Sequence, residues 1–554
     1  MTLFPYAIDD KYKTKVAYFS MEFAIHQALK IYSGGLGFLA GSHMRSVYDL
    51  KQNVVGVSIL WSYGYYNQER REDRSMEVHF RRKHYSFLED TGITVQIQIN
   101  KTPVLVKALL LRADTFQSAP IFLLTTDLPE NDFLTRTITH KLYDAGEETR
   151  IAQEIVLGIG GAKVLEAANE VPQIYHMNEG HALPMAFHLY EKHGKSVSEV
   201  QKRVVFTTHT PEKAGNEEHN IGLLHRMGFF GNLGIEEVQQ ITKQPKQNFS
   251  LTIGALHLSK QANAVSKIHA DVSNDMWSDH LENNRKIVPI TNAQNRRFWA
   301  DKALLRAYEE GEDFEIVARK KHLKRTLFDE VADQTGKLFD PNILTIVWSR
   351  RFVEYKRARL IAMDMQRFRH LVTRDDKPIQ VIWAGKPHPS DSNSINLFNE
   401  IVYLSKEFKR CAILVGYELS LSRLLKRGSD IWLNTPRITR EASGTSGMTA
   451  GMNGSLHLSI PDGWHPEFAL HRRNAFTLPA VDPKLSTEEQ DYIDNKNLMN
   501  MLEDEIIPLY YDHTDEWTQM IRTCIGDLIP AFDSGRMANE YYCKMYNHET
   551  QNTL

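Results

Sequence analysis

The chain has 554 residues, which is more than one hydrophobic core normally serves, since single cores stop growing at about 250–300 residues. Hydrophobic residues make up 42% and charged residues 24%, a composition that excludes a disordered chain and a membrane-spanning one. With 66 basic and 69 acidic side chains the formal net charge is −3, so we expect neither a nucleic acid nor a membrane as partner.

Cysteine and histidine usage gives no metal-binding pattern. The three cysteines, Cys411, Cys524 and Cys543, share no ligand spacing, and the 23 histidines contain no HExxH pair. We therefore expect no metal site. So few cysteines favour a reducing compartment, and charges from Asp9 to Lys13 take the place of an apolar segment. We expect no signal peptide and a cytoplasmic location.

Short apolar runs alternate with longer helical patterns along the whole chain, which is typical of α/β layers built on parallel strands. Several of these runs end in Gly, Asn, Thr or His, and in open α/β sheets ligands bind beyond the carboxyl ends of the strands. The predicted buried strands are Val16–Ser20, Val54–Ile59, Ile121–Thr125, Gln173–Met177, Val204–Thr208, Ile343–Trp348, Ile379–Ala384, Ala412–Val415 and Ile431–Leu433.

The domain boundary is predicted near residue 330. The segment Asp301–Lys337 is charged and helical in pattern, and the apolar run from Pro341 looks like the first strand of a second domain. We therefore expect one domain over 1–330 and another over 331–505. The remaining 506–554 reads as amphipathic helices that we expect to pack back on the first domain.

Two glycine clusters stand next to helical patterns. Tyr32–Gly37 (YSGGLG) precedes one, where adjacent glycines let backbone N–H groups approach an anion at a helix N-terminus. A simple turn is the alternative. The run Gly158–Gly161 lies inside the helical pattern Glu147–Leu165, and we interpret it as close packing of that helix.

A basic segment, Ser349–Arg357 (SRRFVEYKR), directly follows the strand that ends at Trp348. Arginine offers a bidentate fork to phosphate oxygens and lysine a point charge. The alternative is a solvated, basic helix start. The basic segment directly follows a buried strand in the sequence, which favours a phosphate pocket.

A loop of small residues, Glu441–Met448 (EASGTSGM), follows the strand around Ile431. Such a loop exposes several N–H donors, while the Glu441 carboxylate can accept hydrogen bonds from sugar hydroxyls. A flexible linker is the alternative reading. The position between Asp430–Asn434 and Asn453–Leu456 favours a binding loop.

Taken in order, these motifs resemble the bacterial short-form α-glucan phosphorylases, from about Val16 to Trp464. The resemblance implies a GT-B architecture, in which two Rossmann-like, doubly wound α/β domains face each other across a cleft that holds the sugar. The matching segments are Ala17–Phe23 (AYFSMEF), Tyr32–Gly37, Met177–His181 (MNEGH), Phe206–Pro211 (FTTHTP), Ser349–Arg357 and Asp430–Gly447.

On the phosphate side the resemblance assigns roles residue by residue. Gly34 and Gly35 match the glycine loop that donates amides to the substrate phosphate. Arg351 and Lys356 match the basic pair that holds phosphate groups, and Arg350 stands where the family has a basic residue that touches the cofactor phosphate.

On the sugar side, His209 matches the residue whose backbone carbonyl faces the glucosyl ring. Asn292, within Thr291–Phe298 (TNAQNRRF), resembles an asparagine that binds a sugar hydroxyl. The loop that contacts hydroxyls and donates amides is matched by Glu441, Ser443, Gly444 and Thr445.

Thr449 departs from the family pattern. The motif continues there into the lysine that forms a Schiff base with pyridoxal phosphate, and no lysine of this chain lies between Lys426 and Lys484. A threonine cannot form that imine. We therefore predict no covalent pyridoxal phosphate, with a donor phosphate or nucleotide diphosphate in the place of the cofactor phosphate.

Three functions stay open at this point. The first is a retaining α-glucosyltransferase that moves glucosyl units between an α-glucan or glucosyl acceptor and a phosphate-bearing sugar donor, with a nucleotide sugar as one candidate donor. The second is an inactive, glucan-binding or regulatory relative. The third is an α-glucan phosphorylase that holds pyridoxal phosphate without a covalent bond. Donor, acceptor length and any homo-oligomer are not fixed by the sequence.

Overall fold

The structure is a computed structural model that describes residues 3–212, 215–281 and 285–547. These residues form two compact α/β units, each built on a mainly parallel sheet, which is consistent with the predicted GT-B fold class. Unit 1 takes in the described residues of Met1–Tyr66, Phe80–Asn292 and Ser534–Leu554. Unit 2 takes in Asn67–His79 and Ala293–Asp533.

Unit 1 is built on a nine-stranded sheet in the order β13-β12-β9-β8-β1-β2-β7-β6-β5. All neighbours from β13 to β7 pair in parallel, whereas β6 pairs antiparallel with both of its neighbours, β7 and β5. The strands are β1 (Val16–Phe19), β2 (Val54–Ile59), β5 (Glu89–Ile99), β6 (Thr102–Leu111), β7 (Ile121–Thr125), β8 (Ile174–Asn178), β9 (Val204–Thr207), β12 (Gln261–Ala264) and β13 (Val288–Pro289).

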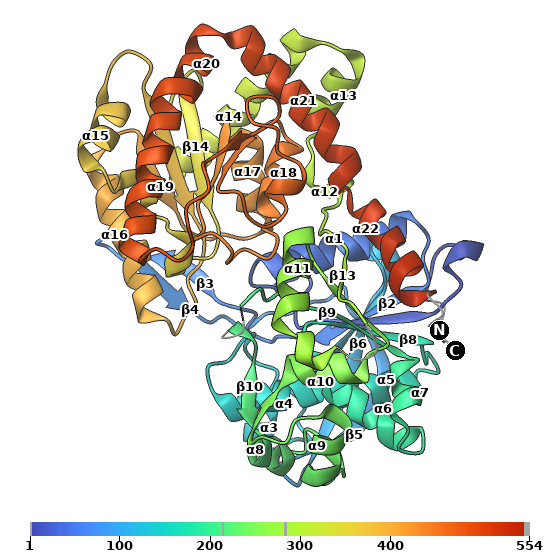
Figure 1. Ribbon diagram of the computed structural model, residues 1–554. Helices are drawn as coiled ribbons and strands as arrows, with labels where there is room; N and C mark the ends of the chain where they lie inside the picture. The colour runs from blue at the N-terminus through green and yellow to red at the C-terminus, as the bar shows by residue number, and fades with distance from the viewer. Residues whose placement is uncertain (1–2, 213–214, 282–284, 548–554) are drawn as a thin grey trace. The chain divides into compact units, whose positions relative to one another are not determined.

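Helices cover both faces of this sheet, with α1, α11 and α22 on one side and α4, α5, α6 and α10 on the other (Figure 1). A small antiparallel pair joins β10 (Glu218–Asn220) to β11 (Asn248–Ser250). The helices are α1 (Gly35–Asp49), α2 (Ala113–Phe116), α3 (Phe133–Thr137), α4 (Glu147–Ile155), α5 (Gly161–Ala167), α6 (Pro184–Lys192), α7 (Val197–Gln201), α8 (Ile221–Met227), α9 (Ile235–Thr242), α10 (Leu251–Leu258), α11 (Lys267–Met276) and α22 (Ser534–Tyr541).

Unit 2 is built on a six-stranded sheet in the order β16-β15-β14-β17-β18-β19, in which every neighbouring pair is parallel. An antiparallel pair, β3 (Asn67–Arg70) and β4 (Met76–His79), belongs to the same unit. The sheet strands are β14 (Leu344–Ser349), β15 (Ile379–Ala384), β16 (Cys411–Leu414), β17 (Ile431–Asn434), β18 (Leu456–Ser459) and β19 (Phe476–Thr477).

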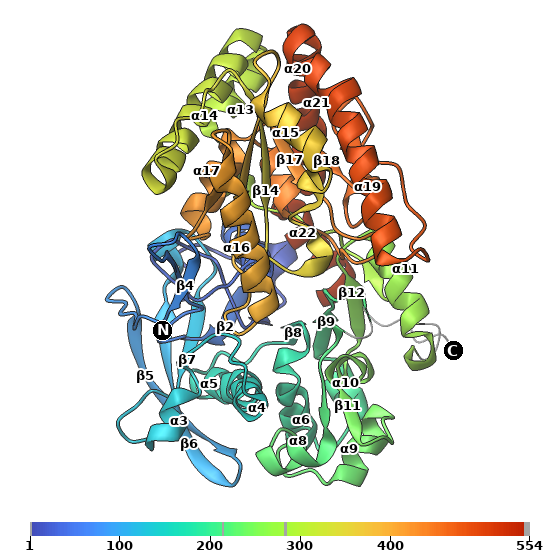
Figure 2. The same ribbon diagram turned by 90° about the vertical axis from the view of Figure 1, so that its left-hand side faces the viewer.

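The helices of unit 2 also form two layers, with α15, α16 and α19 on one side of β14 and α14, α17 and α18 on the other (Figure 1). Helix α13 lies alongside α14 (Figure 2). The helices are α12 (Arg296–Trp299), α13 (Lys302–Glu310), α14 (Asp313–Thr335), α15 (Met365–Thr373), α16 (Ser392–Glu407), α17 (Leu419–Gly428), α18 (Ser446–Gly451), α19 (Thr487–Met501), α20 (Ile507–Asp512) and α21 (Thr514–Phe532).

Every strand predicted from an apolar run is confirmed within one residue at each end, and these strands carry the centres of both sheets. Their burial explains the success, because a strand covered by helices on both faces is apolar throughout. The prediction missed the long hairpin β5–β6. One face of β5 is exposed, so its residues alternate rather than form an apolar run.

The unit boundaries differ from the predicted domain boundaries. Residues 293–330 belong to unit 2, because α14 docks there through its lysines. Lys320 Nζ donates to the carbonyl oxygens of Arg427, Ser429 and Asn453 at 2.8–2.9 Å, and Lys324 forms a buried ion pair with Asp430.

The predicted third segment, 506–554, is divided between the units. Helices α20 and α21 stay with unit 2, and only the chain from Ser534 onward belongs to unit 1. There α22 packs on α1, where the hydroxyls of Ser46 and Ser534 lie 2.5 Å apart.

The glycine run inside the helix Glu147–Leu165 is confirmed as a site of close packing. A Cβ on Gly158 would lie 2.7 Å from the amide nitrogen of Met185, and one on Gly161 would lie 2.7 Å from the Phe19 ring. Among the described residues, no helix combines the length and the apolar character that crossing a membrane requires.

Candidate functional site

Both sheets reverse their strand order at the centre, and such switch points are where open α/β sheets bind ligands. In unit 2 the chain goes from β14 outward to β15 and β16, then returns to β17 on the other side of β14. In unit 1 it goes from β1 to β2 and β7, then returns to β8. Two of the predicted site residues follow these central strands, Arg350 directly after β14 and Gly34 in the segment after β1.

The unit 2 switch point holds two cations on one carboxylate. Arg350 follows β14 directly, and its Nη1 donates to Glu441 Oε2 at 3.1 Å. Lys356 Nζ donates to the same oxygen at 3.0 Å. The side chains of Arg350, Lys356 and Glu441 are only 5%, 13% and 10% exposed, so this is a largely buried set with one more positive than negative charge.

Backbone packing fixes Arg350 in this position. Its amide donates to the Ala384 carbonyl at the end of β15. Gly385, which follows, has φ +147°, and a Cβ there would lie 1.8 Å from the Arg350 carbonyl oxygen. Only glycine allows that close approach. The Nε of Arg350 is buried and has no acceptor among the described residues, so the guanidinium keeps a donor for another anion.

The pKa values of the neighbouring carboxyl groups of Glu441 and Asp462 are shifted in opposite directions. Burial alone would raise the pKa of Glu441, but the charges of Lys356 and Arg350 hold it below its ordinary value. Asp462 accepts the Glu441 amide at 3.0 Å, and burial raises its pKa to about 7. Glu441 is therefore ionised at neutral pH, whereas Asp462 is only partly ionised there.

The loop from Glu441 to α18 brings the other predicted contacts to the same place. Ser443 Oγ is buried without a partner among the described residues, and Gly444 takes φ +81° while its carbonyl accepts Trp464 Nε1 at 3.0 Å. Thr445 caps α18. Thr449 lies inside that helix, fully buried, and its hydroxyl donates to the Ser446 carbonyl at 2.9 Å.

Arg351 is not part of this cluster. The sequence paired it with Lys356, whereas the structure pairs Arg350 with Lys356 and leaves Arg351 exposed. No described side chain forms an ion pair or hydrogen bond with the Arg351 guanidinium. Successive residues beyond a strand end point to different sides, so only one of two adjacent arginines can face the buried carboxylate.

In unit 1 the glycine loop already has a carboxylate partner. Glu22, which is 2% exposed, accepts the amides of Ser33 at 2.6 Å and Gly34 at 3.3 Å. Its other oxygen accepts the Tyr143 hydroxyl at 2.7 Å. The Gly34 amide, predicted to bind a substrate phosphate, is thus bonded inside the chain. A Cβ on Gly34 or Gly35 would meet nothing within 4 Å, so the space above the loop is open within unit 1.

His209 is connected to this loop through the ends of three strands. Its Nε2–H donates to Asn178 Oδ1 at 2.7 Å, since burial lowers the pKa of His209 to about 3 and the ring is neutral. Asn178 donates to Ser20 Oγ at 3.1 Å, and Ser20 Oγ donates to the Glu22 carbonyl at 3.0 Å. The predicted residues Gly34 and His209 therefore belong to one network.

Glu179 holds the backbone of His209 from the other side. The His209 amide donates to Glu179 Oε1 at 2.6 Å, and Glu179 adopts φ +71°, an unusual conformation for a residue other than glycine. Burial raises the pKa of Glu179 to about 7. The peptide that carries the His209 carbonyl includes the Thr210 N–H, which donates to Thr208 Oγ1 at 3.5 Å and so orients that carbonyl.

Asn292 lies at the end of unit 1, beyond β13. Its amide donates to the Val265 carbonyl at 3.0 Å, and its Oδ1 is buried without a donor among the described residues. The side chain is therefore placed inside the fold with an acceptor still available.

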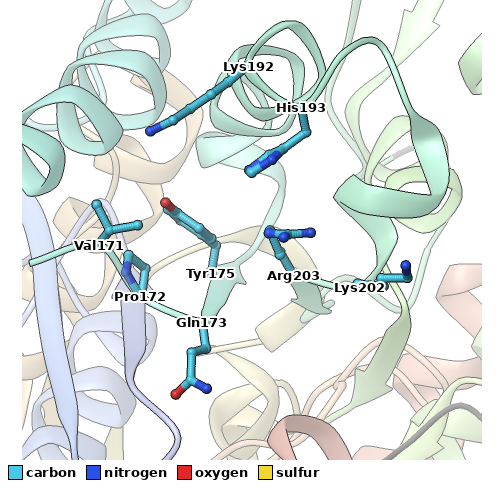
Figure 3. A pocket seen from close by; sticks show the side chains of 8 residues that line it. All are labelled: Val171, Pro172, Gln173, Tyr175, Lys192, His193, Lys202 and Arg203. Atoms are coloured by element: carbon cyan, nitrogen blue, oxygen red, sulfur yellow. The ribbon is translucent and has the colours of Figure 1, made fainter.

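A surface hollow in unit 1 lies at the wrong end of the sheet for this site. It is lined by residues that precede β8 and β9, including Gln173 and Arg203, and by Lys192 at the end of α6 (Figure 3). Its cations are already neutralised, because Lys192 pairs with Glu166 and Arg203 with Glu199. We do not assign the predicted ligands to it.

Sequence reasoning missed Glu22, Tyr143, Glu179 and Asp462. Two of them could have been predicted, because Glu22 and Glu179 lie in the motifs AYFSMEF and MNEGH, just beyond predicted strands. Tyr143 and Asp462 carry no such signal, since their partners Glu22 and Glu441 lie far away in sequence or across a turn.

Comparisons with known proteins identify the family of the chain. A family model described as carbohydrate phosphorylase matches residues 299–477. Over 531 residues the chain is 48% identical to an uncharacterized protein of Methanocaldococcus jannaschii, covering 96% of this chain and 99% of the relative. It is 31% identical to the maltodextrin phosphorylase of Thermococcus litoralis, covering 98% of this chain and 72% of that protein. It is 30% identical to the glycogen phosphorylase of Aquifex aeolicus, covering 97% of this chain and 87% of that protein.

Proposed function

This chain belongs to the carbohydrate phosphorylase family, and from that membership we propose that it is a retaining α-glucosyltransferase that acts on glucan or glucosyl substrates with a phosphate-bearing donor or leaving group. We further propose that it works without covalent pyridoxal phosphate. A nucleotide sugar is then a candidate donor.

The observation that carries the proposal is the buried pair Arg350 and Lys356 on Glu441. Burying two cations is costly unless they are paired, and one carboxylate neutralises only one of them. A donor phosphate would supply the second negative charge. The unpartnered Nε of Arg350 is available to the same anion.

These groups have a direct use in glucosyl transfer. Cleavage of the anomeric bond leaves negative charge on the departing phosphate, and fixed cations in a buried site stabilise that charge without reorganising. Arg350 and Lys356 would bind the phosphate, and Glu441 would accept hydrogen bonds from sugar hydroxyls. In unit 1 the oriented His209 carbonyl would face the positive charge that develops at the anomeric carbon.

Covalent pyridoxal phosphate does not fit the residue at position 449. The side chain there is a hydroxyl that already donates to the Ser446 carbonyl, and a hydroxyl cannot form an imine with an aldehyde. The basic residues for a phosphate group remain, so we place a donor phosphate or nucleotide diphosphate beside Arg350 and Lys356.

Donor use is the decisive test. The purified chain is mixed with labelled maltodextrin and with glucose 1-phosphate or a panel of nucleoside diphosphate glucoses, and the anomeric configuration of the product is read by NMR. We expect α-linked elongation from at least one donor. Binding to glucan without transfer from any donor would replace the enzyme with the glucan-binding alternative.

The cofactor is tested separately. We expect no aldimine absorbance in the purified chain and no pyridoxyl peptide after borohydride reduction. A transfer activity that appears only on adding pyridoxal phosphate, without a reducible adduct, would favour the phosphorylase with a non-covalent cofactor. A reduced adduct on any lysine would contradict the proposal.

A further inference from the structure

Three groups with metal-ligand chemistry meet in unit 1, on elements outside the switch point. Glu154 lies on α4, Glu217 directly precedes β10, and His219 lies within β10. One ligand atom from each lies within 4.8 Å of the other two. Two carboxylate oxygens and an imidazole nitrogen form a donor set that suits a divalent transition-metal ion.

Glu154 gives the strongest indication of a ligand. Its side chain is fully buried, and neither carboxylate oxygen has a hydrogen-bond donor among the described residues. Its nearest cation is Arg150, whose Nη2 is 3.8 Å from Glu154 Oε1. Buried polar atoms in folded proteins are nearly always bonded, so two unbonded oxygens on one carboxylate require an explanation.

His219 is oriented as a metal-binding histidine would be. Its Nδ1 is 2.9 Å from Glu147 Oε1, and its Nε2 is 3.2 Å from Glu217 Oε1. Metal-bound histidines commonly donate their second ring N–H to a carboxylate, which here is Glu147. Two ligands at about 2.1 Å from a tetrahedral ion lie about 3.4 Å apart, close to the observed 3.2 Å between Nε2 and Oε1.

The neighbouring cations do not balance the negative charge of this cluster. Arg150 binds the other oxygen of Glu217, Oε2, at 3.0 Å, and His181 Nε2 is 3.9 Å from that same oxygen. Among the described residues, the hydrogen-bond partner of Glu217 Oε1 is His219. Against the carboxyl groups of Glu147, Glu154 and Glu217, the guanidinium of Arg150 supplies a single permanent positive charge.

We propose that Glu154, Glu217 and His219 bind a Zn²⁺ ion, with Glu147 orienting the His219 ring and water completing the coordination. The ion ties α4 to β10. No spacing of histidines in the sequence predicts this site, because its ligands come from two distant segments, α4 and the start of β10.

Zinc content tests the proposal without any activity assay. The untagged chain is stripped with a chelator, incubated with ZnCl₂, desalted and analysed by elemental mass spectrometry. We expect the wild type to retain one zinc ion per chain and to melt at a higher temperature with zinc than without it. Glu154→Gln and His219→Gln should each abolish both effects, and Glu147→Gln should weaken zinc binding about 10–100-fold.

Glu166→Gln is the matched control. Glu166 and His188 form another carboxylate–histidine pair in unit 1, with Oε1 3.1 Å from Nε2, but no third ligand joins them among the described residues. This variant should retain zinc as the wild type does. Circular dichroism of the chelated proteins checks that each variant is folded. A wild type that retains no zinc would overturn the proposal, and so would equal retention by folded Glu154→Gln and His219→Gln.

Discussion

The two switch points share one topology but carry opposite charge patterns. In unit 2 the central carboxylate, Glu441, is bonded by the cations Arg350 and Lys356. In unit 1 the central carboxylate, Glu22, accepts hydrogen bonds from neutral donors, namely the amides of Ser33 and Gly34 and the Tyr143 hydroxyl. Strand order therefore determines where a ligand binds, and the residues beyond the strand ends determine its charge.

The difference assigns separate tasks to the units. An excess of buried positive charge suits a phosphate, so unit 2 is the donor side in our interpretation. A neutral histidine, an oriented carbonyl and an unbonded amide oxygen of Asn292 suit the hydroxyls of a sugar. The following variants break one side of this comparison at a time.

Loss of a phosphate-binding cation should have the largest effect. Lys356→Ala removes a positive charge that faces the departing phosphate, and the loss of one such group costs about 10²–10³ in rate. Initial rates with the donor identified above measure this. Lys377→Ala, which removes a half-exposed lysine paired with Asp512, is the control and should transfer at the wild-type rate. A folded Lys356→Ala with full activity would contradict the anion pocket.

Arg351→Ala separates the resemblance from the observed geometry. The resemblance assigns Arg351 to the phosphate, so we expect a similar fall in rate, of about 10²–10³. Because no described group pairs with its guanidinium, the melting temperature should stay at the wild-type value. Unchanged rates would leave phosphate binding to Arg350 and Lys356 alone.

Glu441→Gln should destabilise unit 2 and change its ligand preference. Removing one partner of a buried ion pair costs about 3–5 kcal/mol, because the cations stay buried without their counter-charge. Urea unfolding measures the loss. Inorganic phosphate should raise the melting temperature at least as much in this variant as in the wild type, whereas sugar binding should weaken. Equal stability of the two proteins would show that the ion pairs carry no net energy.

Glu22→Gln should have a smaller effect on unit 1. The amide keeps one oxygen as acceptor but loses the charge that favours the N–H groups of Ser33 and Gly34, an interaction worth about 1–2 kcal/mol. Hydrogen exchange of these two amides measures the change directly. We expect faster exchange at Ser33 and Gly34, and an unchanged exchange rate at the Lys356 segment of unit 2.

The raised pKa values of two carboxyl groups, one in each unit, predict a pH dependence of stability. Glu179 and Asp462 have pKa values raised to about 7, so between the ordinary carboxyl range and pH 7 the folded state binds more protons than the unfolded state. Their contribution to stability is greatest below that range and falls as pH rises to about 7. Glu179→Gln and Asp462→Asn should each flatten this fall in urea unfolding between pH 5 and pH 8. If the stability of both variants depended on pH as that of the wild type does, the raised pKa values would be contradicted.

The sequence predicted the fold well where the signal is local. Buried parallel strands are apolar at every position, so β14 and β15 could be read from their own residues. It did not place α14 correctly, because the charged helical segment up to residue 330 was assigned to the first domain, whereas the helix belongs to unit 2. The lysines of that helix are buried because backbone carbonyls of Arg427, Ser429 and Asn453 satisfy Lys320, and no local pattern contains those partners.

By itself the sequence determined the strand-end motifs, the kinship with glucan phosphorylases and the threonine at position 449. Only the tertiary structure decided that Arg350 rather than Arg351 joins Lys356 on Glu441, that Glu22 holds the glycine loop, and that Glu154 meets Glu217 and His219. Strands and turns follow from the side-chain pattern of neighbouring residues. The partner of a charged group depends on which strand ends and helices the fold brings together, and that pairing has no periodicity along the chain.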